Sequence, residues 1–130
     1  MTIHNKISSG IKISVQVSLN EDISIIEQSR FFFNYQITIE NNNPFAVQLL
    51  RRHWEIFDSL HMPRIVDGEG VIGLTPLLEP SQSFSYTSGC DLHSEIGFME
   101  GYYTFLNLVN GDTFEVEIPR FDMCFYGKLN

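Results

Sequence analysis

Residues 11–19 read Ile11-Lys12-Ile13-Ser14-Val15-Gln16-Val17-Ser18-Leu19, a strict alternation of apolar and polar side chains. In a β-strand successive side chains point to opposite faces, so this order places every apolar side chain on one face. A helix with the same order would have no continuous apolar stripe. Residues 31–40 repeat the alternation with aromatic and β-branched side chains, which pleated sheets favour. Both segments therefore predict β-strands that bury one face.

The rest of the chain extends this pattern. Turn-forming residues separate the remaining strand-like segments, and the pair Asn110-Gly111 marks a hairpin. These segments cover residues 47–58, 83–88, 98–109 and 113–118. Helical periodicity is absent from the sequence. We therefore expect an all-β fold, an antiparallel β-sandwich of the immunoglobulin-like kind with about seven strands, and a small barrel is the alternative.

The length of 130 residues suits one domain that buries about two-thirds of its unfolded surface. We expect a single domain over residues 1–130, with its core over about 11–121, a flexible N-terminus over 1–10 and a C-terminal tail over 122–130. The first six residues lack the apolar region of a signal peptide, and the apolar runs are far shorter than a membrane span. The expected location is the cytoplasm.

Charge and cysteine content limit the partners and the redox chemistry. The net charge of −8 is unsuited to nucleic acid or acidic membranes, which are bound by a basic face, so we expect neither partner. Cys90 and Cys124 lie far apart and lack a C-x-x-C partner, so we expect reduced, structural cysteines. The oligomeric state stays open, a homodimer included.

The segment 67–80 contains the pattern G-x-G-x-x-G at Gly68, Gly70 and Gly73. In a dinucleotide-binding fold the third glycine lies in a helix whose N-terminus holds the pyrophosphate. Pro76 excludes that helix, because it lacks the N–H that a helix interior uses and pushes the preceding residue toward extended angles. Two interpretations stay open. The segment is a glycine-rich turn of a β protein, or its backbone N–H groups form an anion-binding concavity without a helix.

Basic side chains gather just upstream of these glycines. They are Arg51, Arg52, His53, His61 and Arg64, and they are the one electrostatic argument for an anionic ligand. The alternative is a solvated face paired with nearby carboxylates. Arg52 also shares the strand parity of Leu50, Trp54 and Ile56, which should face the core. This parity predicts a β-bulge or a paired arginine at the rim of the sheet.

Catalytic and metal-binding patterns are not found in the sequence. Asp91-x-His93 beside Cys90 is the nearest approach to a cluster of metal ligands, but its spacing does not repeat. A cysteine nucleophile needs an electropositive setting, and Asp91 and Glu95 make this loop acidic. We therefore expect no catalytic residues, no metal site and no cofactor.

Several motifs in a fixed order cover the chain from about Val15 to Phe121. They are Phe33-x-Tyr35-x-Ile37-x-Ile39-x-Asn41, Val47-Gln48-Leu49-Leu50-x-Arg52-x-Trp54-x-Ile56, Val66-x-Gly68-x-Gly70-Val71-Ile72-Gly73-x-x-Pro76, Phe84-x-Tyr86-x-Ser88-Gly89, Met99-x-Gly101-x-Tyr103 and Phe114-x-Val116-x-Ile118-Pro119-x-Phe121. With these motifs the chain resembles the ApaG family. The chain departs from the family pattern in three turns, at His61, Pro80-Ser81 and Ser94-Glu95.

The resemblance implies a fibronectin type III-like sandwich. It also implies an association with cobalt tolerance and magnesium efflux, without a settled molecular activity, and animal relatives carry the domain for protein recognition. The glycine motif of the family, discussed as a pyrophosphate site, corresponds here to Gly68, Gly70 and Gly73.

The function expected from the sequence is a non-enzymatic binding module that recognises a protein partner through loops and sheet edges. The alternative is a nucleotide or pyrophosphate binder, or a weak phosphate-ester hydrolase. In it Gly68, Gly70 and Gly73 supply backbone donors, and Arg52 and Arg64 pair with a phosphate-containing small molecule.

Overall fold

The computed structural model describes residues 2–125 of the chain, and these residues form nine β-strands and one short 3-10 turn. The turn, η1, is Ile26–Gln28. The strands are β1 (Thr2–Ser8), β2 (Ile11–Leu19), β3 (Phe31–Asn41), β4 (Val47–Asp58), β5 (Arg64–Glu69), β6 (Leu77–Leu78), β7 (Ser83–Leu92), β8 (Ile96–Asn107) and β9 (Thr113–Cys124). Within this described part, no helix has the length and apolar character needed to cross a membrane.

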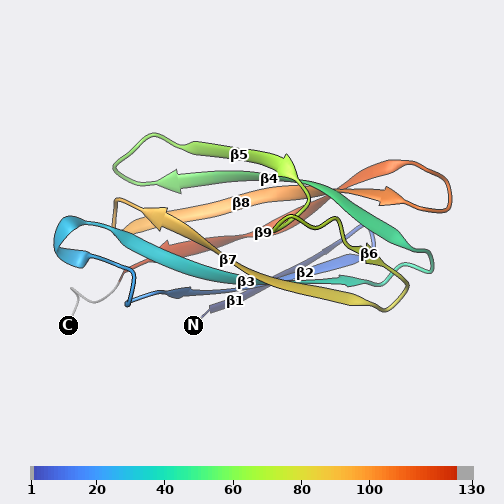
Figure 1. Cartoon of the computed structure of the whole chain (residues 1–130), viewed down its shortest axis with the longest axis horizontal. Helices are drawn as coiled ribbons and strands as arrows, with labels where there is room; N and C mark the ends of the chain where they lie inside the picture. Colours follow the sequence, from blue (N-terminus) through green and yellow to red (C-terminus); the bar gives the residue numbers. More distant parts are fainter. Residues whose placement is uncertain (1, 126–130) are drawn as a thin grey trace.

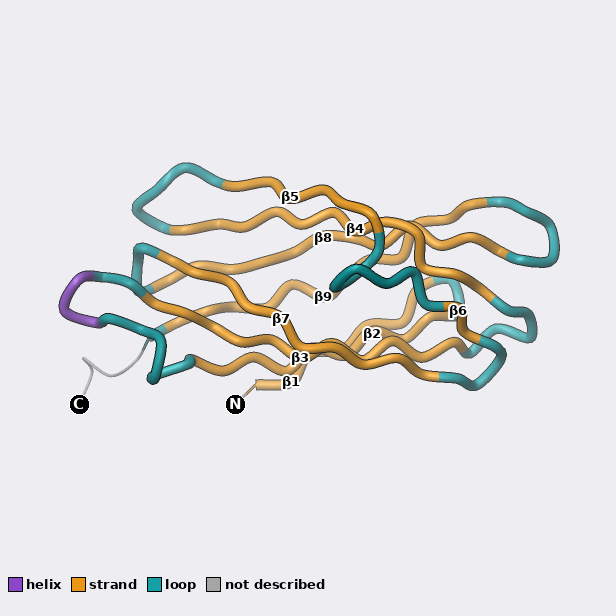
Figure 2. The backbone as a smooth tube through the Cα atoms, viewed as in Figure 1, coloured by secondary structure: helices purple, strands orange, loops and turns teal. Residues whose placement is uncertain are grey.

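The strands form two antiparallel sheets that lie face to face (Figures 1 and 2). The first sheet has the order β1-β2-β3-β7, and the second has the order β5-β4-β8-β9, with β6 paired to β4. The antiparallel β-sandwich expected from the sequence is therefore confirmed. Six of the strands, β2, β3, β4, β7, β8 and β9, correspond to the segments that the sequence pattern indicates, and β1, β5 and β6 are additional.

Strand β1 occupies residues that we expected to form a flexible N-terminus over 1–10. It pairs with β2 over its whole length, from Thr2 opposite Val17 to Ser8 opposite Ile11. The connection is a two-residue turn in which both Ser9 (φ 49°) and Gly10 (φ 73°) have positive φ, as a type I′ hairpin requires.

The C-terminal boundary also differs from the expected one. Strand β9 continues past Pro119 to Cys124, into the tail expected over 122–130. The ladder between β8 and β9 shifts between Met99 and Gly101, opposite Pro119, and this irregularity accommodates a residue that has no N–H to donate. The remainder of the expected tail, residues 126–130, lies outside the described residues.

The core lies between the sheets and is built by the alternating segments. Ile11, Ile13 and Val15 are fully buried, as their parity predicts. Three aromatic rings from both sheets meet at the centre. The ring centroids of Tyr35 and Phe121 are 5.5 Å apart, and that of Trp54 lies 5.6 Å from Tyr35. Fully burying side chains of this size contributes about 1.5–3 kcal/mol each.

A β-bulge in β4 determines which side chains of that strand face the core. The pairing with β8 shifts between Leu49 and Arg51, so the inward parity changes there. Leu49 is buried before the bulge, and Trp54 is buried after it. Leu50, which the sequence placed in the core, is only half buried because it lies in the irregular stretch. The bulge turns Arg52 inward, between the two sheets.

The two long sides of the sandwich are built differently. On one side, which we call the closed side, β9 packs against β1 and β2 of the other sheet. Here the ammonium group of Lys6 forms an ion pair with Glu117, and the backbone N–H of Glu117 donates to Ser8 Oγ over 3.3 Å. The other side, which we call the open side, has the edge strands β5 and β7 (Figure 1).

Candidate functional site

The glycine loop, residues 67–76, lies on the open side and contains no helix. Strand β5 ends at Glu69, and a narrow two-residue turn follows, in which the backbone groups of Val71 and Leu74 bond each other over 2.8 and 2.9 Å. Its central residues are Ile72 (φ 43°) and Gly73 (φ 77°). The exclusion of a dinucleotide-binding fold is confirmed, because the chain after Gly73 continues as an extended connection.

Gly68 and Gly70 have separate structural reasons. A Cβ atom on Gly68 would lie 2.8 Å from the guanidinium carbon of Arg52 and at the same distance from two of its nitrogens. The planar guanidinium therefore lies flat on the Cα of Gly68. Gly70 has a φ of +62°, and a Cβ atom there would lie 2.1 Å from the carbonyl oxygen of Leu74. Only glycine fits either position without a shift of its neighbours.

Arg52 holds the glycine loop from the inside. Its Nη1 donates to the carbonyl oxygens of Glu69 and Gly70, each over 3.0 Å. Both alternatives that the sequence indicated are present together, because the bulge turns this side chain inward and the loop carbonyls pair with it. Among the described residues no carboxylate forms an ion pair with Arg52.

Three backbone N–H groups of the loop, those of Gly70, Val71 and Leu74, bond to the protein itself. The N–H of Gly70 donates to the carbonyl of Leu50 over 2.7 Å, and the N–H of Val71 donates within the turn. The carbonyl groups of Glu69 and Gly70 point to Arg52. At Glu69 and Gly70 the loop thus presents acceptors to a cation, whereas an anion-binding concavity presents donors.

Arg64 lies apart from Arg52 and joins the two sheets. From β5 its Nη1 donates to Asp91 Oδ1 of β7 over 3.1 Å, and its Nη2 donates to the carbonyl oxygen of Asp91. Partial burial raises the pKa of Asp91, but the hydrogen bond and charge of Arg64 outweigh that effect, so the pKa lies below its usual value. Arg52, Gly68 and Gly70 therefore form one cluster, and Arg64 belongs to another.

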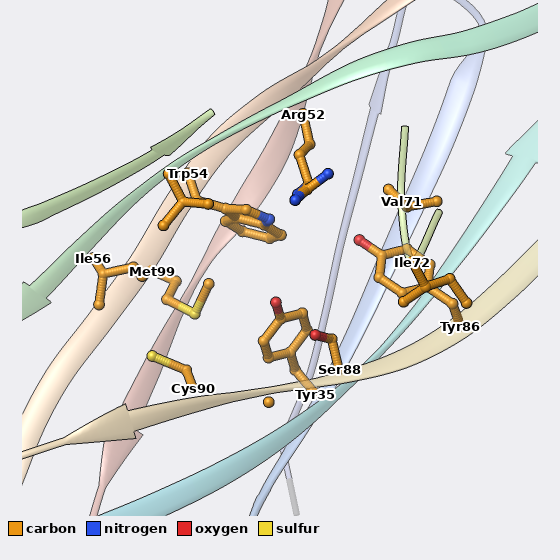
Figure 3. Close-up of a pocket in the computed structure, with 12 residues that line it drawn as sticks. Tyr35, Arg52, Trp54, Ile56, Val71, Ile72, Tyr86, Ser88, Cys90 and Met99 are labelled. Carbon is orange, nitrogen blue, oxygen red and sulfur yellow. The ribbon is translucent and has the colours of Figure 1, made fainter. Parts of the chain in front are cut away.

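A cleft of about 280 Å³ lies between the sheets on the open side (Figure 3), and we call it the open-side cleft. Its apolar lining residues are Trp54, Ile56, Val66, Val71, Ile72 and Met99. Its polar lining residues are Tyr35, Arg52, Tyr86, Ser88 and Cys90, with Gly89 beside them. In Figure 3 Arg52 points from β4 toward Tyr35 across the cleft. A largely apolar cavity with a few convergent polar groups is the usual form of a binding site.

The sequence alone did not reveal this cleft, because its residues have the parity of core positions. The signal that was available is the use of tyrosine at three inward positions, where phenylalanine would fill the core without a hydroxyl. Tyr86 and Tyr103 join their hydroxyl groups in a hydrogen bond. Burial raises the pKa of Tyr35, Tyr86 and Tyr103, so all three phenols are neutral at pH 7.

The second cluster of polar residues surrounds Cys90, where β7 ends. Burial raises the pKa of the Cys90 thiol to about 11, so the thiol is protonated at neutral pH and a poor nucleophile. Both cysteines are free. The rings of His61 and His93 lie 5.2 Å apart. Within residues 2–125, however, no group of three histidine, cysteine, aspartate or glutamate side chains is placed to hold a metal ion.

Comparisons with known proteins agree with the fold and with the motifs. The profile of the ApaG domain family (DUF525) matches residues 21–107. Protein ApaG of Methylorubrum populi is 46% identical over 114 residues, which cover 88% of this chain and 87% of the relative. Protein ApaG of Brucella anthropi is 40% identical over 121 residues, which cover 93% and 92% of the two chains. A crystal structure assigned to an ApaA protein from Bordetella pertussis superposes with a TM-score of 0.85 at 36% identity, covering 88% of this chain and 93% of that one. The chain therefore belongs to the ApaG family.

Proposed function

We propose that this ApaG-family chain is a non-enzymatic binding module that recognises a protein partner through its open side. In this proposal an extended segment of the partner pairs with the free edge of β7. The observation that carries it is the pairing of β7, which forms a strand ladder only with β3 among the described residues and is linked to β5 through the side chain of Arg64 at Asp91. The second edge strand of the open side, β5, likewise forms a strand ladder only with β4.

The composition of β7 supports strand addition. An unpaired edge exposes backbone donors and acceptors, and proteins usually protect such edges with lysine, proline or bulges. Strand β7 contains neither lysine nor proline. Its outward side chains before Asp91 are small and uncharged, namely Ser83, Ser85, Thr87 and the glycine at 89. Such an edge allows another strand to approach closely, and binding then comes from backbone hydrogen bonds.

The chemistry of the cleft favours binding over catalysis. A general base or nucleophile works best when its pKa lies near the pH of its surroundings. Burial moves the pKa values of Tyr86 and Cys90 away from neutrality, so both groups keep their protons. Exposed apolar side chains at the rim, such as Ile72 and Val66, add surface that a partner can cover.

The phosphate alternative stays a prediction. In it Gly68, Gly70 and Gly73 would hold a nucleotide or pyrophosphate with Arg52 and Arg64. Arg52 lines the cleft, but Arg64 is bonded to Asp91 outside that lining. The cytoplasmic location and the association with cobalt tolerance and magnesium efflux also stay predictions.

The test charges the edge of β7. We expect the purified chain, immobilised and exposed to a lysate of its native host, to retain one or more proteins that the double variant Ser85→Lys, Thr87→Lys does not retain. Both residues are exposed, and the variant loses one exposed hydrogen bond, between Ser85 Oγ and Thr38 Oγ1, so we expect the free energy of unfolding to fall by no more than about 1 kcal/mol while lysine charges the edge. Thr113→Lys is the matched control, because Thr113 is an exposed strand residue of β9 on the other sheet. Hydrogen exchange should show slower exchange of β7 amides in the complex.

Equal retention by the edge variant and by the control would show that β7 is not the binding edge. Steady turnover of a phosphate ester by the purified chain, abolished by Arg52→Ala, would replace the binding module with the hydrolase alternative.

A further inference from the structure

The guanidinium of Arg52 is a positive charge without a carboxylate partner in residues 2–125. Its Nη1 donates hydrogen bonds to the glycine loop, and Gly68 covers one face of the planar group. The other donors of the group make no hydrogen bond with the described residues, and Arg52 is one of the residues that line the open-side cleft. A guanidinium presents its N–H groups in a fork that matches the two oxygens of a carboxylate.

The charge count of the cleft favours one carboxylate over a pyrophosphate. Arg52 is the single cationic side chain in the lining, and half of the lining residues are apolar. A pyrophosphate carries several negative charges and binds to arrays of backbone donors, whereas the amides of Gly70 and Val71 are bonded within the protein. The cleft therefore fits a ligand with one negative charge beside an apolar group.

The ends of the cleft limit the ligand to a short one. Arg52 lies opposite Gly68 in the pairing of β4 with β5, and Ile56 lies opposite Arg64. Ile72 of the glycine loop lines the first end (Figure 3). At the second end Arg64 Nη2 lies 3.7 Å from the sulfur of Cys90, a lining residue, and the ion pair between Arg64 and Asp91 spans from one sheet to the other beside it. A volume of about 280 Å³ between these boundaries accepts one or two residues and excludes a longer extended segment.

We infer that the open-side cleft binds the C-terminal residue of the partner, with its α-carboxylate on Arg52 and an apolar side chain against Trp54 and Met99. A chain terminus brings a single carboxylate next to its own side chain, which is the combination that the lining fits. This inference rests on the proposed function and names the chemical groups by which the partner is recognised. The remainder of the partner's terminal segment follows the free edge of β7.

Trp54 is the one tryptophan of the chain and lines the cleft, so its fluorescence reports binding. The probe is an N-acetylated glycine-threonine-leucine tripeptide with a free carboxylate, and its C-terminal amide is the matched ligand. We expect saturable fluorescence and calorimetric changes with the acid, and binding of the amide weaker by about tenfold or more, because it lacks the charge-assisted hydrogen bonds.

Parallel titrations use 4-methylpentanoate, an acetylated peptide amide with an internal aspartate, and inorganic pyrophosphate. Weaker saturation by 4-methylpentanoate than by the tripeptide is expected, because it carries the same carboxylate and branched body without the preceding backbone.

Two variants separate recognition from folding. Arg52→Lys keeps the charge and loses the fork, and we expect it to weaken binding of the tripeptide acid about tenfold. Val66→Glu places a carboxylate at the exposed rim beside the cleft, and we expect it to abolish binding of the acid although Arg52 is intact. Arg120→Gln is the control, because that arginine lies over the ring of Phe98 outside the cleft, and the variant should bind like the unmodified chain.

Equal affinity for the acid and the amide, or saturation by pyrophosphate or the internal aspartate peptide alone, would overturn the inference. So would the absence of any signal with the tripeptide acid at millimolar concentration. These results would leave the binding module standing if the lysine variants of β7 still lose the host protein. Tripeptide binding combined with unchanged capture by those variants would instead remove the edge of β7 from the proposed function.

Discussion

The closed side and the open side of this sandwich are built from strands with the same alternating pattern, but the space between the sheets is filled differently on the two sides. On the closed side strand β9 packs against β1 and β2, and the inward side chains of β2 from Ile11 to Val15 are fully buried. On the open side the sheets end in β5 and β7, and the space between them is a cleft with an arginine and tyrosine hydroxyl groups in its lining.

The difference shows where stability and where recognition reside. Apolar side chains stabilise by leaving water, and they do so most where both sheets cover them. Polar groups turned inward cost free energy unless they are bonded, and the open side retains several of them. The open side therefore gives up some stability, and the substitutions below measure how much.

The largest expected effect compares two isoleucines. Ile13→Ala in β2 should lower the free energy of unfolding by about 2–5 kcal/mol, because Ile13 is fully buried and its loss leaves a cavity. Ile65→Ala in β5 should change it by less than about 0.5 kcal/mol, because that side chain is 65% exposed. Urea denaturation of both variants measures the contrast. Similar losses for the two variants would mean that the sides do not differ.

The next largest effect on stability is expected from the contact between Arg52 and Gly68. Gly68→Ala should destabilise the chain by about 1–3 kcal/mol, because the new methyl group displaces the guanidinium from the carbonyls of Glu69 and Gly70. In an Arg52→Ala background the same change should stabilise by about 0.4–1 kcal/mol, because alanine then lowers only the entropy of the unfolded chain. A double-mutant cycle measures this reversal. Additive effects would show that the guanidinium and the glycine do not act together.

A smaller effect of opposite sign is expected in the turn at Ile72. A β-branched residue with a φ of 43° is strained, and asparagine is favoured at this position of a type I′ turn. Ile72→Asn should raise the free energy of unfolding by about 1 kcal/mol and the melting temperature by a few degrees. Gly73→Ala is the control. It should destabilise although no atom lies within 4 Å of its Cβ position, because its φ is +77°. A loss of stability in the asparagine variant would mean that packing of Ile72 outweighs its strain.

The smallest effect is a pH dependence of the edge strand β5. His53 of β4 bonds Asp67 of β5 over 2.6 Å and lies 3.4 Å from Glu55. The hydrogen bond to Asp67 raises the pKa of His53 in the folded chain. The interaction of protonated His53 with Asp67 thus contributes fully to the free energy of unfolding below the unfolded pKa of about 6.5. This contribution is lost as the pH rises through the folded pKa. The loss should be below about 1 kcal/mol, because both carboxylates are exposed. In Asp67→Asn the slope of stability against pH over this range should shrink, and an unchanged slope would point to another group.

The alternation of side chains predicted the closed side well and the open side poorly. Residues 11–19 and 31–40 lie where their pattern places them, because burial on one face imposes a period of two. The same period could not indicate which edge strands leave a cleft between the sheets. That depends on pairings between distant segments, such as Phe33 with Cys90, and on a bulge that moves Leu50 out of the core.

The glycine motif shows a second limit of the sequence. Its spacing matches that of phosphate-binding loops, yet each glycine has its own steric reason here. Gly68 lies under a guanidinium, Gly70 would collide with Leu74, and Gly73 completes a tight turn. Contacts with Arg52 sixteen residues earlier cannot be read from the motif itself. Phosphate binding by these glycines stays a prediction.

The ion pair between Arg64 and Asp91 has a consequence for how the sandwich responds to ionic strength. It is a polar link across the open side, and its two side chains are 38% and 59% exposed. Dissolved salt screens such a pair, with a Debye length that falls from about 10 Å at 0.1 M to about 3 Å at 1 M, whereas the buried aliphatic contacts of the closed side are unaffected by screening. Concentrated electrolyte also screens the exposed pair of Lys6 and Glu117 on the closed side, but there the packing of β9 against β1 and β2 remains. Loss of the pair between Arg64 and Asp91 therefore loosens the side at which the cleft opens more than the closed side.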